Sequence, residues 1–293
     1  MAESKNEIRT FKAGGRTVTV YRAGGAKTGS VKADAGAGRS ATGAGAAKPA
    51  AGTGAAKPAA GAGAAKPAAG AGAAEARGAG APDAPGSGTG IPVIYLNTFR
   101  GNGSEVVSAL EKTDCPEITL AVIGDLEWDN DMAPWDIPPI MEGDTPCTGG
   151  ADDYLKLLTE QIIPETESGE KPAWRGLAGY SLAGLFAVYT MYRSYMFSRI
   201  ATMSGSLWFP DFAEFATENE PVRRPDRLYM SLGSKEDNTR NRYLRVVRKN
   251  TEKLYEHYRG LGIDATFEIN PGSHYANVDE RTAAGIAWIA KGE

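Results

Sequence analysis

Apolar residues along the chain gather in short runs that are separated by polar and glycine-rich segments. Residues 91–99 and 118–123 are two such runs, and both are rich in β-branched side chains. A continuous apolar run of this length is typical of a strand that is buried on both faces. Residues 105–112, between them, have the composition of a short helix. A strand, a helix and a strand in this order form a βαβ unit, so the pattern predicts a parallel sheet.

Further elements follow the same alternation toward the C-terminus. The expected helices are at residues 152–163, 185–192, 239–259 and 278–291. The expected strands are at residues 171–178, 228–233 and 265–270, with another within 198–209 that ends in a loop of small residues. Residues 124–150 combine prolines, acidic residues and tryptophans, and we expect an irregular loop there at the C-terminal edge of the sheet, where sites often lie.

The N-terminal part of the chain has a different pattern. Residues 8–22 form two alternating runs on either side of Gly14-Gly15, which is the signal of an antiparallel hairpin. The fold class is therefore predicted to be α/β, with a mostly parallel central sheet, helices on both faces and an N-terminal antiparallel hairpin.

Residues 24–90 are dominated by Ala, Gly, Lys and Pro, and the segment Ala-Ala-Lys-Pro-Ala-Ala-Gly recurs with a period of nine residues. From Val31 to Gly90 there is no Leu, Ile, Met or aromatic residue. Such a segment has too little apolar surface to offset its ordering entropy, so disorder is expected. The predicted organisation is a hairpin within residues 1–23, a disordered insert at 24–90 and an α/β core at 91–293.

Composition narrows the possible classes of protein. The 293 residues are 42% hydrophobic and carry a net charge of −4, which indicates neither nucleic-acid binding nor a membrane protein. No stretch approaches the roughly 18 apolar residues of a membrane span. The first residues are polar and lack the apolar core of a signal peptide, so a cytoplasmic location is expected, with Cys115 and Cys147 as reduced thiols.

The stretch most informative about chemistry is Gly179-Tyr180-Ser181-Leu182-Ala183-Gly184. It lies between an expected strand and an expected helix, as the nucleophile elbow of α/β-hydrolases does. A serine in so sharp a turn needs small neighbours, and Gly179, Ala183 and Gly184 supply them. The strict pattern G-x-S-x-G appears here with Ala183 at its last place. A close crossing of a strand and a helix is the other arrangement that these small residues favour.

A base and an acid for this serine can be sought among few residues. The chain has two histidines: His257 lies in a basic helix, and His274 lies in a glycine-containing loop between the last strand and the last helix. Glu236 follows an expected strand and a glycine, with Asp237 as the alternative acid. The order Ser181, Glu236, His274 is the order of the triad in α/β-hydrolases, so these three residues are the predicted catalytic residues.

Four stretches of the chain together resemble the Putative esterase group of α/β-hydrolases, which includes esterase D and enterochelin-esterase-like proteins. These stretches are residues 179–186, 204–209, 231–236 and 272–274. The resemblance covers residues 8–22 and 91–293 and implies hydrolysis of a carboxylic ester. It leaves the substrate open, because the group includes siderophore esterases, S-formylglutathione hydrolases and mycolyl transferases. The loop where siderophore esterases carry an arginine is here residues 128–135, which contain none, and this argues against a ferric catecholate.

In the resulting hypothesis, Ser181 attacks the ester carbonyl, His274 acts as general base and then acid, and Glu236 orients His274. The oxyanion is expected to bind the backbone N–H of Leu182 and one from either Thr98 or Phe99. The chemistry requires no metal or organic cofactor. The aromatic residues expected to contact the small-molecule ester are Tyr180, Trp135 and Trp208, and packing in the core is the alternative for Trp135, as it is for Trp128.

Two other functions remain compatible with the same sequence. An acyltransferase would use the same triad to pass the acyl group to an alcohol other than water. A non-catalytic binding protein on the hydrolase fold would make the Lys-Pro-Ala insert the functional part. Turnover of a short-chain p-nitrophenyl ester and product analysis with a candidate acceptor separate these possibilities from a hydrolase.

Overall fold

The computed structural model describes residues 6–25 and 88–292, which belong to one compact unit. Most of the predicted insert at 24–90 lies outside the described residues. Its described ends pack against the core: the N–H of Gly25 donates to the carbonyl of Cys115, and the N–H of Gly90 donates to that of Lys171.

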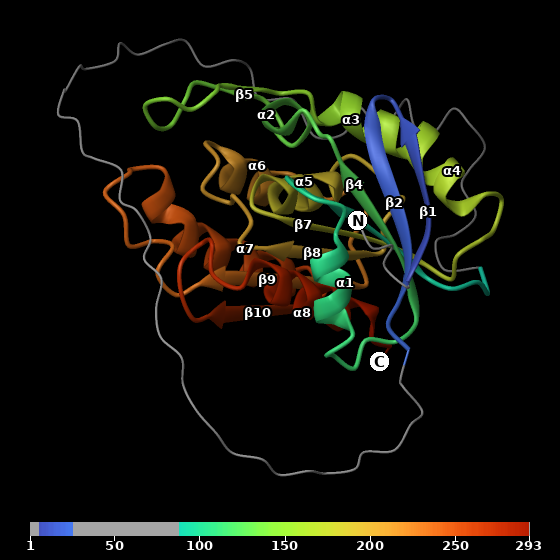
Figure 1. The fold of residues 1–293 in the computed structure, drawn as a ribbon. Coiled ribbons are helices and arrows are strands. Elements are labelled where there is room, and N and C mark those ends of the chain that lie inside the picture. Colours follow the sequence, from blue (N-terminus) through green and yellow to red (C-terminus); the bar gives the residue numbers. More distant parts are fainter. Residues whose placement is uncertain (1–5, 26–87, 293) are drawn as a thin grey trace, which may run out of the picture. The chain divides into compact units, whose positions relative to one another are not determined.

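An eight-stranded sheet forms the centre of this unit, with its strands in the order β1-β2-β4-β3-β7-β8-β9-β10. Figure 1 shows β7, β8, β9 and β10 side by side, and β1 and β2 next to β4. The strands are β1 (Glu7–Ala13), β2 (Arg16–Ala23), β3 (Val93–Asn97), β4 (Ile118–Gly124), β7 (Arg175–Tyr180), β8 (Arg199–Met203), β9 (Arg227–Gly233) and β10 (Asp264–Asn270). From β4 to β10 every neighbouring pair is parallel, whereas β2 pairs antiparallel with both β1 and β4. The predicted mostly parallel sheet with an N-terminal hairpin is therefore confirmed.

The hairpin turn is the one expected at Gly14-Gly15. Both glycines have positive φ, +54° and +81°, which a tight two-residue hairpin turn requires and which side chains with a Cβ rarely adopt. The pair Ala13 and Arg16 closes the turn in register.

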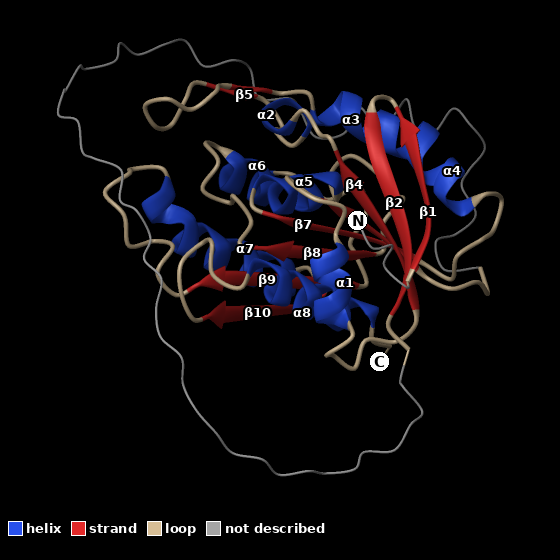
Figure 2. Ribbon diagram, viewed as in Figure 1, coloured by secondary structure: helices blue, strands red, loops and turns tan. Residues whose placement is uncertain are grey.

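Helices cover both faces of the sheet, as Figure 2 shows. The helices are α1 (Ser104–Leu110), α2 (Trp128–Asp131), α3 (Ala151–Leu157), α4 (Ile163–Glu167), α5 (Leu182–Thr190), α6 (Phe212–Glu218), α7 (Val247–Gly260) and α8 (Val278–Ala290). Buried residues of α3, α5, α6 and α7 share one hydrophobic cluster with the sheet, and those of α1 and α8 share a second one with it. The two clusters are the two sides of the core.

Two helix predictions were wrong at their boundaries. The helix expected at 239–259 begins at Val247, after a 3₁₀ turn over Leu244–Val246. The Asn241 side chain explains the late start, because its Oδ1 accepts the N–H groups of Tyr243 and Leu244 while its amide donates to the carbonyl of Ile140. Such local side-chain bonds offer the backbone an alternative to helix.

The helix expected at 152–163 is longer than predicted. It runs from α3 through a π-helical turn over Leu158–Ile162 into α4, which contains Pro164 in its first turn. A proline lacks an N–H and its ring disrupts the preceding turn, so the wider π-helical turn lets the helix continue past it.

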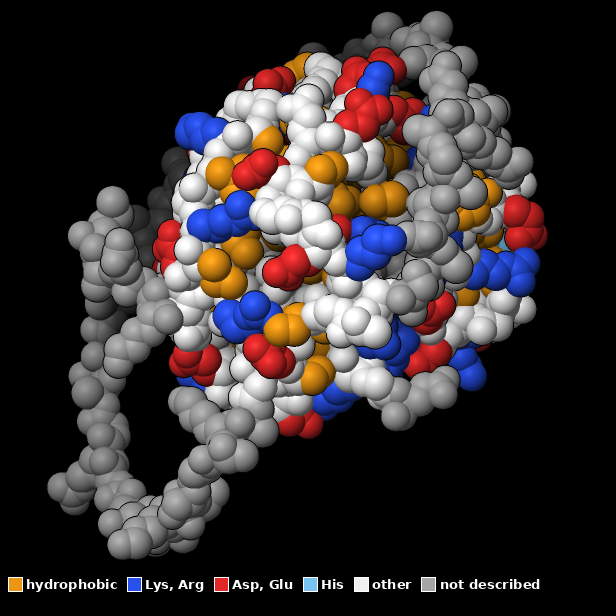
Figure 3. Space-filling model, turned by 90° about the vertical axis from the view of Figure 1, so that its right-hand side faces the viewer, with side chains coloured by type: hydrophobic (Ala, Val, Ile, Leu, Met, Phe, Trp, Pro, Cys, Tyr) orange, Lys and Arg blue, Asp and Glu red, His pale blue; other side chains and the backbone are white. Residues whose placement is uncertain are grey.

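The loop expected at 124–150 contains α2 and a small antiparallel pair, β5 (Asp136–Ile137) and β6 (Cys147–Thr148). Both cysteines are buried and neither forms a disulfide. None of the helices in the described part of the chain has the length and apolar character that crossing a membrane requires. Figure 3 shows basic and acidic side chains interspersed on the side of the molecule where β1, β2 and α4 lie.

Candidate active site

Ser181 occupies the single residue between the end of β7 and the start of α5. Its φ is +59°, a strained value for a residue with a side chain, and strain of this kind concentrates at functional sites. The neighbours of Ser181 must be small because larger side chains would collide with nearby atoms. A Cβ atom at Gly179 would lie 2.3 Å from the carbonyl carbon of Ala183, and one at Gly184 would lie 2.9 Å from the Cα of Gly205. The sharp turn therefore exists only because these positions lack side chains.

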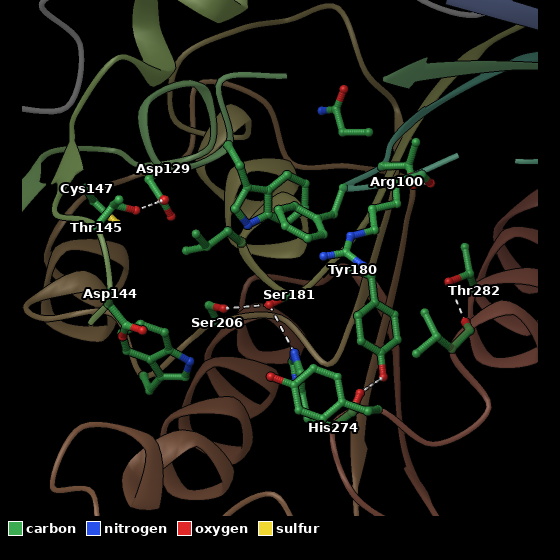
Figure 4. A pocket seen from close by; sticks show the side chains of 18 of the residues that line it. Arg100, Asp129, Asp144, Thr145, Cys147, Tyr180, Ser181, Ser206, His274 and Thr282 are labelled. Carbon is green, nitrogen blue, oxygen red and sulfur yellow. Dashed lines mark hydrogen bonds between the residues drawn. The ribbon is translucent and has the colours of Figure 1, made fainter. Parts of the chain in front are cut away.

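His274 and Glu236 lie beside Ser181 because all three follow parallel strands that end at the same edge of the sheet. His274 Nε2 is 3.1 Å from Ser181 Oγ, and its Nδ1 is 2.8 Å from Glu236 Oε2. Figure 4 shows Ser181 between the ring of His274 and the hydroxyl of Ser206, whose Oγ is 3.4 Å from that of Ser181. Serine, imidazole and carboxylate thus form one continuous line of hydrogen bonds.

The carboxylate of Glu236 is almost fully buried, with its side chain 4% exposed. Its Oε1 accepts the N–H of Gly233 and the hydroxyl of Ser204, both at 2.6 Å. Burial alone would raise the pKa of Glu236. The hydrogen bonds from His274 and Ser204, the charge of His274 and the N–H of Gly233 outweigh burial and lower that pKa to about 2. Glu236 is therefore ionised at any pH near neutrality.

The alternative acid, Asp237, lies next in sequence and points elsewhere. Its Oδ2 is 3.0 Å from Nε of Arg248 on α7. The structure therefore brings Glu236, and not Asp237, to His274.

The second histidine, His257, is on α7. Its Nε2 is buried without a hydrogen-bond partner among the described residues, and its ring packs against Tyr258. Desolvation by burial lowers the pKa of His257. It shares no contact with Ser181.

The N–H of Leu182 and one from either Thr98 or Phe99 were expected at the oxyanion, and two of these three candidate groups have no hydrogen-bond partner within the described part of the chain. These are the N–H of Leu182, at the first position of α5, and that of Phe99, and both residues line the cavity around Ser181. The expectation for Thr98 was wrong, because its N–H donates to the carbonyl of Ile123 at 3.0 Å and so continues the sheet. A donor already bonded in this way is not available to an oxyanion.

The cavity beside Ser181 has a volume of about 650 Å³ and an apolar lining. Two of the three aromatic residues expected to contact substrate, Tyr180 and Trp208, line it. Trp135 does not: it is 7% exposed, packs against Phe209 and Phe215, and donates its indole N–H to the carbonyl of Pro210. Trp135 is a core residue, and the prediction that it contacts substrate was wrong. The loop borders the site through Trp128, whose ring packs edge-on against Phe99 at 5.0 Å.

Other cavity residues were missed from the sequence. Figure 4 shows Arg100 on the same side of Ser181 as Tyr180, and Asp129, Asp144 and Cys147 on the other side. Arg100 directly follows Phe99, one of the expected oxyanion donors. Its position just after a parallel strand is the sequence feature that could have indicated a place near the site. Ser206 lies in a stretch that carried the family resemblance, but nothing local indicated its contact with Ser181.

Besides Ser181 and Ser206, the cavity contains the thiol of Cys147, which could act as a nucleophile if it were ionised. Burial, together with the carboxylates of Asp129 and Asp144, raises the pKa of Cys147 to about 12. The thiol therefore stays protonated near neutral pH and does not compete with Ser181. Within residues 6–25 and 88–292, no group of three or more His, Cys, Asp or Glu side chains is arranged to hold a metal ion.

Comparison with known sequences identifies a family. The profile of the family described as Putative esterase matches residues 87–274, more than half of the chain. The uncharacterized protein YbbA of Bacillus subtilis (strain 168) is 26% identical over 182 residues, which are 59% of this chain and 73% of that protein.

Solved structures share the fold. The siderophore hydrolase EstA from Aspergillus nidulans has a TM-score of 0.55 at 21% identity, over 70% of this chain and 84% of that chain. An IroE-like serine hydrolase from Shewanella oneidensis has a TM-score of 0.55 at 18% identity, over 68% and 70% of the two chains. The predicted α/β-hydrolase fold is confirmed by these likenesses together with the sheet order.

Proposed function

The chain belongs to the Putative esterase family and is a carboxylic ester hydrolase, and we propose that Ser181, His274 and Glu236 are its catalytic triad. The observation that carries this proposal is the unbroken line of hydrogen bonds from Glu236 Oε2 through the imidazole to Ser181 Oγ. A neutral hydroxyl becomes a nucleophile when a base is within hydrogen-bond reach, and His274 is at that distance.

In this mechanism, the protonated Nδ1 of His274 donates to Glu236, which leaves the lone pair of Nε2 facing Ser181 Oγ. Ser181 attacks the ester carbonyl while Nε2 takes its proton. The tetrahedral oxyanion accepts hydrogen bonds from the N–H groups of Leu182 and Phe99. His274 then protonates the leaving alcohol, and an acyl-enzyme forms on Ser181. Water, activated by the same imidazole, releases the acid and regenerates the hydroxyl.

The cavity indicates the kind of ester that fits. Its aromatic side chains suit a substrate with flat or apolar groups, and the exposed rings of Phe99 and Tyr275 extend this surface to the entrance. Among the described residues that line the cavity, the ionisable carboxyl groups are those of Asp129, Asp144 and Asp279, against the guanidinium of Arg100. We therefore propose a small-molecule ester without a large negative charge. The fungal relative of similar fold is a siderophore hydrolase, and this lining disfavours the polyanionic iron complex of a catecholate siderophore for the present chain.

A covalent label tests the nucleophile directly. A fluorophosphonate should inactivate the enzyme and add its mass to the peptide that contains Ser181, because an ionisable serine–histidine pair attacks phosphorus as it attacks a carbonyl. Ser206→Ala is the matched control, since that hydroxyl is 3.4 Å from Ser181 Oγ, and it should label normally while Ser181→Ala should not. A label found on Ser206 would transfer the role of nucleophile to that residue.

The two neighbouring acids give a second prediction. Glu236→Gln should lower kcat by at least about 10²-fold, because an amide does not stabilise the imidazolium and favours the wrong tautomer. Asp237→Asn should change kcat by less than about threefold, because Asp237 is bonded to Arg248 and not to His274. Steady-state turnover of a p-nitrophenyl ester measures both. If Asp237→Asn were the more damaging change, the two acids would have to exchange roles.

A further inference from the structure

Arg281, on α8, is a buried arginine that the mechanism above does not use. Its side chain is only 4% exposed, and it does not line the cavity beside Ser181. A buried charge is costly unless it is paired and hydrogen-bonded. The contacts that Arg281 makes therefore indicate what it does.

The first group of contacts is with the acid of the proposed triad. One terminal nitrogen of Arg281 lies 3.2 Å from Glu236 Oε1 and also donates to the hydroxyl of Ser204. That hydroxyl in turn donates to the same Oε1. Together with the N–H of Gly233, these donors occupy Oε1 and leave Oε2 to His274.

The second group of contacts is with the loop that carries His274. The other terminal nitrogen of Arg281 lies 3.3 Å from the carbonyl oxygen of Ser273 and 3.5 Å from that of Ala276. Its Nε donates to the side-chain oxygen of Asn270, at the end of β10, at 2.9 Å. The guanidinium thus binds groups on both sides of His274 in the sequence.

A third contact reaches the residue before the nucleophile. The guanidinium carbon of Arg281 is 5.3 Å from the centre of the Tyr180 ring, within the range of a cation–π contact. The hydroxyl of Tyr180 donates to the carbonyl of His274 at 2.7 Å. One buried side chain therefore contacts the acid, the loop of the base and the end of the strand that presents the serine.

We propose that Arg281 is a positioning residue that holds Glu236 and His274 in register with Ser181, an inference that rests on the proposed triad. Both Glu236 and His274 lie in turns beyond the ends of strands, where the backbone alone holds a side chain loosely. Arg281 projects from α8, which packs on β8 and β9, so its hydrogen bonds attach these turns to a rigid part of the fold. Because it lies behind the triad and outside the cavity, it acts on the chemical step and not on substrate binding.

The test is Arg281→Met, which keeps an unbranched apolar stem but removes the guanidinium. Turnover should be measured at a temperature well below the melting temperature of every variant. We expect kcat to fall by about 10²-fold, the scale of a small misplacement of catalytic groups, while KM stays within about twofold. Arg281→Lys keeps the charge but cannot reach all of these acceptors, so its kcat should lie between those of the wild type and Arg281→Met.

Arg227→Met is the matched control for loss of a well-bonded arginine. Arg227 also binds a carboxylate, that of Asp264. It donates to the carbonyl groups of Trp288 on α8 and of Lys291 just after α8, and its guanidinium lies over the ring of Trp288. It lies at the start of β9, the opposite end of that strand from Glu236. Its replacement should lower the melting temperature without lowering kcat.

A double variant separates positioning from general stability. If Arg281 acts through Glu236, Arg281→Met should cost far less in a Glu236→Gln background than in the wild type. Three results would overturn the proposal: an unchanged kcat, a change confined to KM, or the same fold-loss in both backgrounds. If Arg281→Met did not fold, the same cycle with Arg281→Lys would decide. Ser181→Ala, measured in parallel, reports on the triad itself, because turnover retained there would contradict the proposed function whatever Arg281 does.

Discussion

We expect Ser181→Ala and His274→Ala each to lower kcat on a short-chain p-nitrophenyl ester by roughly 10³-fold or more. In the proposed mechanism, the first change removes the hydroxyl that forms the acyl-enzyme. The second removes the base 3.1 Å from the oxygen of that hydroxyl. Because the two act as one unit, the double variant should be little worse than either single variant. Steady-state kinetics on the four proteins, with near-identical melting temperatures as a check of folding, measure the effect.

His257→Ala is the control for loss of a histidine. It lies on α7 and shares no contact with Ser181 or Glu236 within the described part of the chain, so kcat should stay within about twofold of the wild type. If kcat were retained equally in His274→Ala and His257→Ala, Ser181 would have no histidine base. The proposed triad would then have to be given up, although the family and the fold would stand.

The site residues most accessible from the sequence were those that a local pattern marks. Ser181 is marked by the small residues on either side of it, and His274 by its place between the last strand and the last helix. Parallel strands end at one edge of a sheet, so residues that follow different strands can be expected to meet there. This reasoning is enough to bring Glu236 and His274 close to Ser181, but it does not distinguish Glu236 from Asp237. Glu236 and Asp237 are distinguished by Arg248, which binds Asp237 and lies on α7, the helix whose start was predicted at the wrong residue.

The predictions that were wrong concern residues whose role depends on a partner that is distant in sequence. Trp135 and Trp128 are chemically equivalent in the sequence, yet one is enclosed by Phe209 and Phe215 and the other faces the cavity. Thr98 and Phe99 are adjacent in sequence. Only the pairing of β3 with β4 shows that the N–H of Thr98 already donates to a carbonyl of β4.

Arg281 was missed for a related reason. It lies in a helix that was predicted, but nothing near it in sequence indicates that it faces Glu236, a residue of another segment. A buried arginine cannot be recognised from a single sequence, because arginine is ordinarily an exposed residue. Its role emerges only once the ends of β9 and β10 and the start of α8 are placed together.

The second large effect is expected at Gly179, the first residue of the elbow sequence. A Cβ atom there would lie 2.3 Å from both the carbonyl carbon and the carbonyl oxygen of Ala183, which belong to the first turn of α5. These are backbone atoms, so no side-chain rotation can relieve the clash, and either β7 or α5 must move. Overpacking of a rigid core of this kind is strongly destabilising.

We therefore expect Gly179→Ala to lower the free energy of unfolding by about 3 kcal/mol or more, the upper range for a single overpacked site. Gly260→Ala is the matched control: Gly260 ends α7, and apart from the adjacent backbone of its own helix, no atom of the described residues would lie within 4 Å of a Cβ there. Neither glycine has a positive φ, so the two substitutions differ in contact and not in backbone strain. Since alanine favours helix over glycine, Gly260→Ala should raise the free energy of unfolding by up to about 1 kcal/mol. Urea denaturation of both variants measures the difference. A Gly179→Ala protein as stable as the wild type would show that β7 and α5 can separate without cost, and the close crossing could not then be what forces Ser181 into its strained turn.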